Sequence, residues 1–282
     1  MGAIASASSL WGLAPPERTA ALADSLDSMG MADVPYYQRL VRAASGEVLE
    51  LGAGTGRLTI PLAQVGATLT AVDNERAVLS VLERRLLEVG QSVRARVHVI
   101  EADLRTLQLP TRFMLIIVPA NTWLLFPSAA ERAQVLAVIR AHLHPQGRVV
   151  IDIFNATPSD EMLDVWMDDG SAQLGEGMTI SRSVRVHRIG ETSAQRLGVT
   201  QRYTLLGPQG PLEWERSLQL GYLSPQQGRD ECEAAGFAVR HIHGDYSGRT
   251  EVAADSSRQL YQLRLPLIER EAAITAYQRR SP

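Results

Sequence analysis

Three glycines spaced two residues apart form the stretch of this sequence best suited to bind a small molecule. Gly52, Gly54 and Gly56 follow the strand-like run Val48–Leu51, and a pattern of helical period begins at Leu58. Glycines at a turn from a strand to a helix let the backbone bend sharply and approach a ligand closely, because no Cβ stands in the way. The pattern predicts a nucleoside-binding turn, with a purely structural turn as the alternative.

The residues around this turn argue against cofactors that carry phosphates. A dinucleotide fingerprint would place its third glycine where this chain has Arg57. A phosphate-binding loop needs a lysine after its glycines, and all 28 basic residues of the chain are arginines. What remains is a cofactor with a ribose and an adenine but no phosphate, a description that fits S-adenosylmethionine. A nicotinamide oxidoreductase is the fold-level alternative, and Arg57 speaks against it.

Acidic residues end the next two strands, where they could hold the nucleoside. Asp73 follows the short apolar strand 69–72, a position from which a carboxylate can accept both ribose hydroxyls. Asp103 follows the strand 97–100, where a carboxylate could take the adenine amino group and a backbone N–H could meet a ring nitrogen. Each acid alone is more typical of a solvated loop, but the strand ends together favour a site. The predicted cofactor-binding residues are Glu50, Gly52, Ala53, Gly54, Arg57, Asp73, Asn74, Asp103, Leu104 and Pro119.

The elements that must position these residues follow the order of an α/β domain. The continuous apolar run 113–118 is typical of a central parallel strand that is buried on both faces. A turn at 145–147 precedes the fifth strand. The predicted strands are 48–51, 69–72, 97–100, 113–118, 148–154, 238–242 and 259–265, and the predicted helices of the domain are 75–89, 131–142 and 225–235. We therefore predict a Rossmann-like, doubly wound seven-stranded sheet with a small antiparallel β insertion.

In these motifs the sequence resembles the class I S-adenosylmethionine-dependent methyltransferases, and within them a bacterial small-molecule branch with an inserted β-sheet. The resemblance spans roughly residues 33–265. It implies transfer of a methyl group to N or O of a small molecule, in specialised metabolism. A peptide or protein methyltransferase and a non-catalytic S-adenosylmethionine-binding domain are the alternatives. The segments that carry the resemblance are 33–37, 50–57, 72–73, 101–104, 121–122, 152–155, 222–225, 233–237, 244–248 and 255–259.

The resemblance also suggests which residues meet the methyl acceptor. Tyr36 and Tyr37 precede the helix that enters the first strand, and in the family an aromatic residue here faces the methyl donor, so Tyr37 is our candidate. Many members carry a histidine four residues after the asparagine of the fourth strand's loop, where this chain has Leu125, so the general base is unassigned. The predicted catalytic residues are Tyr37, Asn121, Trp123 and Tyr222.

A change of hydrophobic period after the fifth strand marks the insertion. Strand-like stretches at 178–189, 197–206 and 212–223 predict a three-stranded antiparallel sheet. Such inserts roof the active site in the resembling branch, and a structural or dimerising sheet is the alternative. The predicted division is a tail and cap helix at 1–34, a Rossmann-like core at 35–158 and 222–265, the inserted sheet at 159–221 and a tail helix at 266–282.

Composition limits the partners of the chain. A net charge of −3 argues against nucleic acid or an acidic membrane as the main partner. No apolar run reaches the ~18 residues that span a bilayer, and a single cysteine cannot form an internal disulfide, so we expect a cytoplasmic protein. His241, His243 and Asp245 lie close in sequence, but no other ligand spacing supports a metal site. The expected partner is a small-molecule methyl acceptor, with a homodimer left open.

Overall fold

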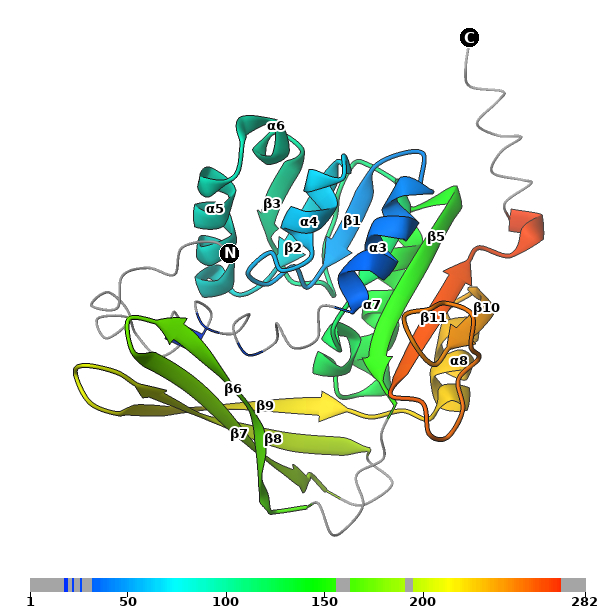
Figure 1. Ribbon diagram of the computed structural model, residues 1–282. Coiled ribbons are helices and arrows are strands. Elements are labelled where there is room, and N and C mark those ends of the chain that lie inside the picture. Colours follow the sequence, from blue (N-terminus) through cyan, green and yellow to red (C-terminus); the bar gives the residue numbers. More distant parts are fainter. Residues whose placement is uncertain are drawn as a thin grey trace.

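Two sheets organise the protein in a computed structural model that describes Arg18, Thr19, Leu22, Leu26 and residues 32–155, 163–190 and 195–269. Sheet A has seven strands in the order β10-β11-β5-β4-β1-β2-β3, and sheet B has four strands in the order β6-β7-β8-β9 (Figure 1). Sheet B is inserted between β5 and α8. The predicted fold class, a doubly wound seven-stranded sheet with an antiparallel insertion, is confirmed.

The strand order of sheet A creates a switch point between β1 and β4. The chain moves outward from β1 to β2 and β3, and then returns to place β4 and β5 on the other side of β1. Neighbours among these five strands are parallel, and β11 is antiparallel to both β5 and β10. Ligands of doubly wound folds bind at the carboxyl ends of the strands beside such a switch point. The strands are β1 Val48–Leu51, β2 Leu69–Asp73, β3 Val97–Glu101, β4 Phe113–Val118, β5 Leu143–Phe154, β10 Ala238–His243 and β11 Arg258–Arg264.

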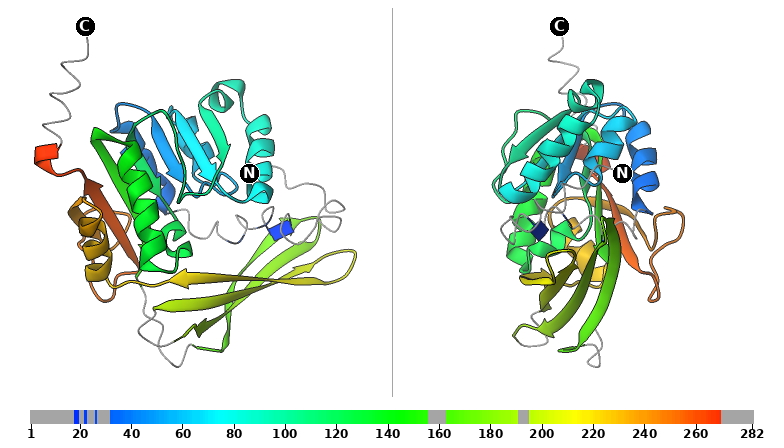
Figure 2. Two further views of the ribbon diagram at one scale, coloured as in Figure 1. Left: turned by 180° about the vertical axis from the view of Figure 1, so that it is seen from behind. Right: turned by 60° about the vertical axis from the view of Figure 1, so that its left-hand side comes forward.

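Helices cover both faces of sheet A (Figure 2). On one face, Val48, Leu115 and Ile117 are buried together with residues of α3 and α4. On the opposite face, Leu49 and Ile116 are buried together with residues of α7 and α8. This alternation arises because successive strand residues point to opposite sides of the sheet. The helices are α3 Asp33–Arg42, α4 Thr59–Gln64, α5 Arg76–Glu88, α6 Gln91–Arg94, the 3₁₀ helix η2 Thr122–Leu125, α7 Ala129–His142 and α8 Pro225–Ala234.

The structure differs from the sequence prediction in three local features. Sheet B has a fourth strand, β6, which the prediction of three strands missed because Asp168, Asp169 and Gly170 are poor strand formers and the pairing with β7 is interrupted there. The predicted turn at 145–147 lies inside β5, where the register against β4 shifts. The tyrosines expected ahead of a helix lie within α3 itself. The strands of sheet B are β6 Trp166–Gly175, β7 Met178–Arg188, β8 Arg196–Leu206 and β9 Leu212–Gly221.

The ends of the chain fall largely outside the described residues. Of the predicted cap helix, Arg18, Thr19, Leu22 and Leu26 are described and helical, and the predicted tail helix is described as far as Glu269. Within the described part of the chain, no helix has the length and apolarity needed to cross a membrane.

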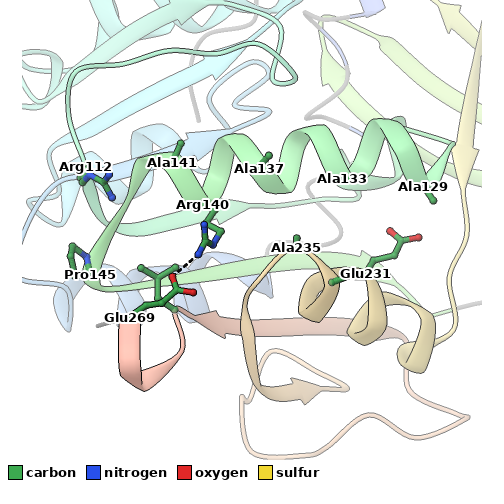
Figure 3. A pocket seen from close by; sticks show the side chains of 12 residues that line it. Arg112, Ala129, Ala133, Ala137, Arg140, Ala141, Pro145, Glu231, Ala235 and Glu269 are labelled. Atoms are coloured by element: carbon green, nitrogen blue, oxygen red, sulfur yellow. Dashed lines mark hydrogen bonds and ion pairs between the residues drawn. The ribbon is translucent and has the colours of Figure 1, made fainter. Parts of the chain in front are cut away.

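A groove of about 700 Å³ runs along α7 and α8 on the outer side of the domain (Figure 3). Ala133, Ala137 and Ala141 form much of its wall, and an ion pair between Arg140 and Glu269 closes one end at 2.5 Å. None of its lining residues belongs to the glycine turn or to α3. The groove is therefore separate from the predicted cofactor site.

Candidate active site

The glycine turn has backbone torsion angles that favour glycine, and it packs closely against the loop after β4. Gly52, Gly54 and Gly56 have positive φ angles of 82°, 55° and 86°. A Cβ on Gly52 would lie 2.3 Å from Thr122 Oγ1, so β1 and the loop after β4 touch here. A Cβ on Gly54 would meet no atom within 4 Å. The middle glycine therefore presents bare backbone on an open side of the turn, as a close-fitting ligand requires.

Asp73, at the end of β2, holds this turn in place. Its Oδ2 accepts the Gly54 N–H at 2.9 Å, and its Oδ1 accepts the Glu75 N–H at 3.0 Å. Each carboxylate oxygen has a second lone pair, so both oxygens can still accept a ribose hydroxyl. The exposed Asn74 follows directly. The placement suits the predicted ribose role, which remains a prediction.

Glu50 is a buried acid inside β1. Its side chain accepts the Thr59 hydroxyl at 2.7 Å, and the residue is 1% exposed. Burial raises the pKa of Glu50 to about 7, and the Thr59 hydrogen bond opposes this rise. Glu50 therefore exchanges its proton near neutral pH, beside the glycine turn.

The remaining predicted cofactor residues make contacts within the protein. Asp103 forms an ion pair with Arg105 at 2.6 Å, and hydrogen bonds from Arg105 lower its pKa. An adenine amino group bound by Asp103 would have to share this carboxylate with Arg105. Arg57 forms a two-pronged ion pair with Asp33, at 2.8 and 2.6 Å, which fastens α3 to the glycine turn. Ala53, Leu104 and Pro119 are buried at the same edge of sheet A.

The acceptor side of the site is built around a buried carboxylate, that of Asp152, which was not among the predicted site residues. Asp152 is fully buried at the carboxyl end of β5. Arg258 pairs with its Oδ1 at 2.5 and 2.8 Å, and the hydroxyls of Tyr37 and Tyr246 donate to its Oδ2 at 3.4 and 2.9 Å. The Asn121 carbonyl oxygen accepts a hydrogen bond from the same Arg258 at 3.1 Å. The structure thus brings Tyr37 and Asn121 together around Asp152.

Asp152 could have been noticed in the sequence, since it is the one charged residue in the apolar run Val149–Phe154. A buried acid in such a run needs a partner, and this is a signal for a built site. Tyr246 and Arg258 lie in the segments 244–248 and 255–259 that carry the resemblance, but nothing in the sequence pairs them with Asp152, which is 94 and 106 residues away along the chain.

The other two predicted catalytic residues lie in hydrophobic clusters. Trp123 is 0% exposed in the core, edge-on to Tyr261 with ring centres 6.0 Å apart. Tyr222 is 7% exposed and belongs to a cluster with Leu197 and Val199 of β8. Among the described residues neither side chain has a hydrogen bond to Asp152, and the catalytic role of both stays a prediction. Within the described residues, no three His, Cys, Asp or Glu side chains are arranged to hold a metal ion.

Sheet B reaches the cofactor side of the core at two places. Arg216 of β9 forms an ion pair with Glu75 at 3.1 Å, two residues beyond Asp73. At the C-terminal end of β9, a Cβ on Gly221 would come within 2.8 Å of Arg132 Nη1 in α7. Trp214, two residues before Arg216 in the same strand, donates from Nε1 to Thr19 Oγ1 at 2.7 Å. The inserted sheet and the described N-terminal residues therefore contact each other on this side.

The site fits one type of cofactor. The turn offers bare backbone at Gly54 and an acid that can bind ribose at Asp73, and it lacks the lysine of a phosphate-binding loop. These features, at the switch point of a doubly wound sheet, define a nucleoside-binding α/β domain of the type used by S-adenosylmethionine-dependent enzymes.

Comparison with known proteins gives the class of the chain. The profile of a methyltransferase domain matches residues 48–147. The chain is 26% identical over 208 residues to the cypemycin N-terminal methyltransferase of Streptomyces sp, covering 73% of this chain and 78% of that protein. It shares its fold with an S-adenosylmethionine-dependent methyltransferase from Clostridium acetobutylicum, at a TM-score of 0.73 and 14% identity over 88% of this chain and 98% of the other.

The sugar N-methyltransferase KedS8 from Streptoalloteichus sp has the same fold, with a TM-score of 0.63 and 19% identity over 83% of this chain and 87% of the other. The two structural likenesses show the fold, and the matched domain shows that residues 48–147 resemble a methyltransferase domain. Together with the cypemycin enzyme, they support an S-adenosylmethionine-dependent methyltransferase of class I fold.

Proposed function

We propose that this methyltransferase transfers a methyl group to an amino nitrogen of a small molecule. The observation that carries the proposal is the meeting of the glycine turn, the Asp152 cluster and sheet B at one edge of sheet A. The Asp33–Arg57 ion pair joins the turn to α3, and Tyr37 of the same helix reaches Asp152. A cofactor on the turn and an acceptor at Asp152 would therefore be neighbours.

In this proposal the cofactor lies along the turn, held by Glu50, Gly52, Ala53, Gly54, Arg57, Asp73, Asn74, Asp103, Leu104 and Pro119. When bound, S-adenosylmethionine supplies a methyl group that is already activated by its sulfonium leaving group. The chain has mainly to hold the nucleophile in line at roughly 3 Å from the methyl carbon and to exclude water. Deprotonating the amine is the remaining acid–base work.

Nitrogen is preferred to oxygen as the acceptor atom because two proteins similar to this chain are named as N-methyltransferases. The cypemycin enzyme is named for an N-terminal amine and KedS8 for a sugar nitrogen. A neutral amine can attack without a strong base, whereas a hydroxyl must lose its proton. The chain has Leu125 at the position where many family members carry a histidine, which favours the less demanding nucleophile. Oxygen remains the alternative atom.

A small acceptor is preferred because sheet B contacts the core at two places near the site. The Arg216–Glu75 ion pair lies beside the cofactor turn, and Gly221 lies close to Arg132 of α7 and to Pro127, which follows η2. These contacts favour a covered pocket rather than an open groove as the acceptor site. A peptide amino terminus is the second candidate, favoured by the 26% identity to the cypemycin enzyme.

The proposal is tested in two steps. Calorimetric titration with S-adenosylmethionine, S-adenosylhomocysteine and NAD should give binding of the first two and none of the third. Mass spectrometry then follows methyl transfer to glucosamine, to the peptide Ala-Ala-Ala and to catechol, which represent a small amine, a peptide amine and a hydroxyl acceptor. Transfer to the peptide alone would favour the second candidate, and transfer to catechol alone would contradict nitrogen as the acceptor atom. Cofactor binding without transfer to any acceptor would favour a non-catalytic binding domain.

A further inference from the structure

A second tyrosine stands beside Asp152, outside the predicted catalytic set. Tyr246 lies in the loop between β10 and β11, and its hydroxyl is 2.9 Å from Asp152 Oδ2. Tyr37 of α3 donates to the same oxygen at 3.4 Å. Two phenol groups from distant parts of the chain therefore converge on one carboxylate oxygen, at the carboxyl end of β5.

Contacts at both ends of the Tyr246 residue fix its position. The Arg39 guanidinium donates to its backbone carbonyl at 2.9 Å, and its ring lies 5.9 Å from the ring of Tyr36. Farther along the same loop, the Asn155 amide donates to the carbonyls of Ala253 and Ser256 at 3.0 and 2.9 Å. The loop is thus tied to α3 and to the end of β5, and the hydroxyl is held by packing as well as by its hydrogen bond.

The direction of the Tyr246 proton follows from its partner. Asp152 is paired with Arg258, and a carboxylate can only accept hydrogen bonds. Burial and the charge of Asp152 raise the pKa of Tyr246, so the phenol keeps its proton and points it at Asp152. The lone pairs of the phenol oxygen remain free to accept a hydrogen bond. Tyr37 is fully buried, whereas Tyr246 is partly exposed, so Tyr246 is the more accessible of the two tyrosines.

We propose that Tyr246 binds the acceptor amine, with its hydroxyl oxygen accepting an N–H hydrogen bond, and that Asp152 and Arg258 are its positioning residues. This rests on the proposed function. An amine whose N–H is held in this way can direct its lone pair at the methyl carbon. The nitrogen bonds to that carbon as the carbon–sulfur bond breaks, with its electron pair left on sulfur, and the proton that the nitrogen sheds goes to water. Tyr246 itself gains no proton.

The test uses sinefungin, in which a carbon bearing an amino group replaces the methylated sulfur. Its amine takes the place of the transferred methyl group, facing the acceptor, and S-adenosylhomocysteine has no such amine. Calorimetry on Tyr246→Phe should show roughly tenfold or greater loss of sinefungin affinity, because a hydrogen bond to a charged amine is lost. The affinity for S-adenosylhomocysteine should stay within about twofold of the wild-type value.

Tyr261→Phe is the matched control. The Tyr261 hydroxyl also donates a buried hydrogen bond, to Gln259, but its ring lies in the core beside Trp123. The control should lose stability and keep both affinities. Asp152→Asn should reduce the preference for sinefungin as Tyr246→Phe does, and if that variant fails to fold, the Tyr246→Phe comparison decides alone.

Equal losses for both ligands in Tyr246→Phe, unchanged sinefungin affinity, or the same selective loss in Tyr261→Phe would overturn the assignment of Tyr246. Failure of the wild-type protein to bind S-adenosylhomocysteine would overturn the cofactor site as well, so the two proposals fail by different readouts. Once an amine substrate has been identified, Tyr246→Phe should raise the KM for that amine and leave the KM for the cofactor unchanged. A fall in kcat alone would contradict a binding role.

Discussion

Glu50 should make the folded protein less stable as the pH rises. Its pKa is about 7 in the folded protein against an ordinary value of 4.5, mainly because burial disfavours the charged form. At about 1.4 kcal/mol per pKa unit, this rise corresponds to roughly 3 kcal/mol. The folded state holds the Glu50 proton at pH values where the unfolded chain has released it. The free energy of unfolding should therefore fall between about pH 4.5 and pH 7. Above pH 7 it should be lower by the full amount.

The variant Glu50→Gln tests this reasoning, because a glutamine carbonyl can still accept the Thr59 hydroxyl but cannot ionise. Urea unfolding of both proteins at about pH 5, 6, 7 and 8 gives their stabilities by linear extrapolation. The advantage of the variant should grow with pH, by about 2.5 kcal/mol between pH 5 and pH 8, because part of the cost is already present at pH 5. Glu101→Gln is the control, since Glu101 is an exposed acid opposite Asp73 in the sheet register.

A difference between Glu50→Gln and wild type that stays constant or shrinks with pH would refute the argument. So would a pH-dependent gain in Glu101→Gln, since the effect would then not come from burial. If the prediction holds, the wild-type protein maintains a costly ionisable group next to the glycine turn. A cationic cofactor would favour the charged form of that group, so calorimetric binding of S-adenosylmethionine near pH 7 should release a fraction of a proton.

Three further predictions concern the cofactor site and the inserted sheet. Asp73→Ala should weaken S-adenosylmethionine binding by about 1.5 to 3 kcal/mol in calorimetry, with Glu101→Ala unchanged, because hydrogen bonds to a charged group are lost; an unchanged affinity would remove Asp73 from the site. Gly52→Ala should abolish cofactor binding and lower the urea midpoint, because its φ is 82° and its Cβ would lie 2.3 Å from Thr122 Oγ1. Replacing residues 166–221 by a short linker should abolish methyl transfer and leave nucleoside binding detectable, and an active variant would contradict a covering role.

The sheet and the cofactor turn could be predicted because their signals are local. Apolar runs ending in glycines and acids specify strands, turns and strand ends within a few residues of each other. The fourth strand of sheet B, β6, could not be predicted in the same way. Its pairing with β7 is interrupted between Asp168 and Ser171, and the two acidic residues and the glycine there weaken the β pattern. Long-range pairing overrides this weak local preference.

The acceptor side was less accessible to sequence reasoning because it depends on contacts between distant segments. Asp152 meets Tyr246 across 94 residues and Tyr37 across 115 residues. Trp123 illustrates the converse: its place in a loop at the carboxyl end of a strand suggested a ligand contact, yet its ring is buried beside Tyr261. A loop position decides which edge of the sheet a residue is near, but packing decides which way the side chain points.

The charges around the site explain why the glycine turn suits a cationic cofactor. The pairs Asp33–Arg57 and Asp152–Arg258 bury four charges with no net charge. Buried ion pairs add little to stability, because desolvation offsets their attraction, so their main effect is to fix α3 and β11 at the edge of the site. Asp73, which accepts hydrogen bonds from the backbone N–H groups of Gly54 and Glu75, and the ionised fraction of Glu50 then leave the turn with net negative charge. Such a turn attracts a sulfonium cation and repels a phosphate, in agreement with the missing lysine.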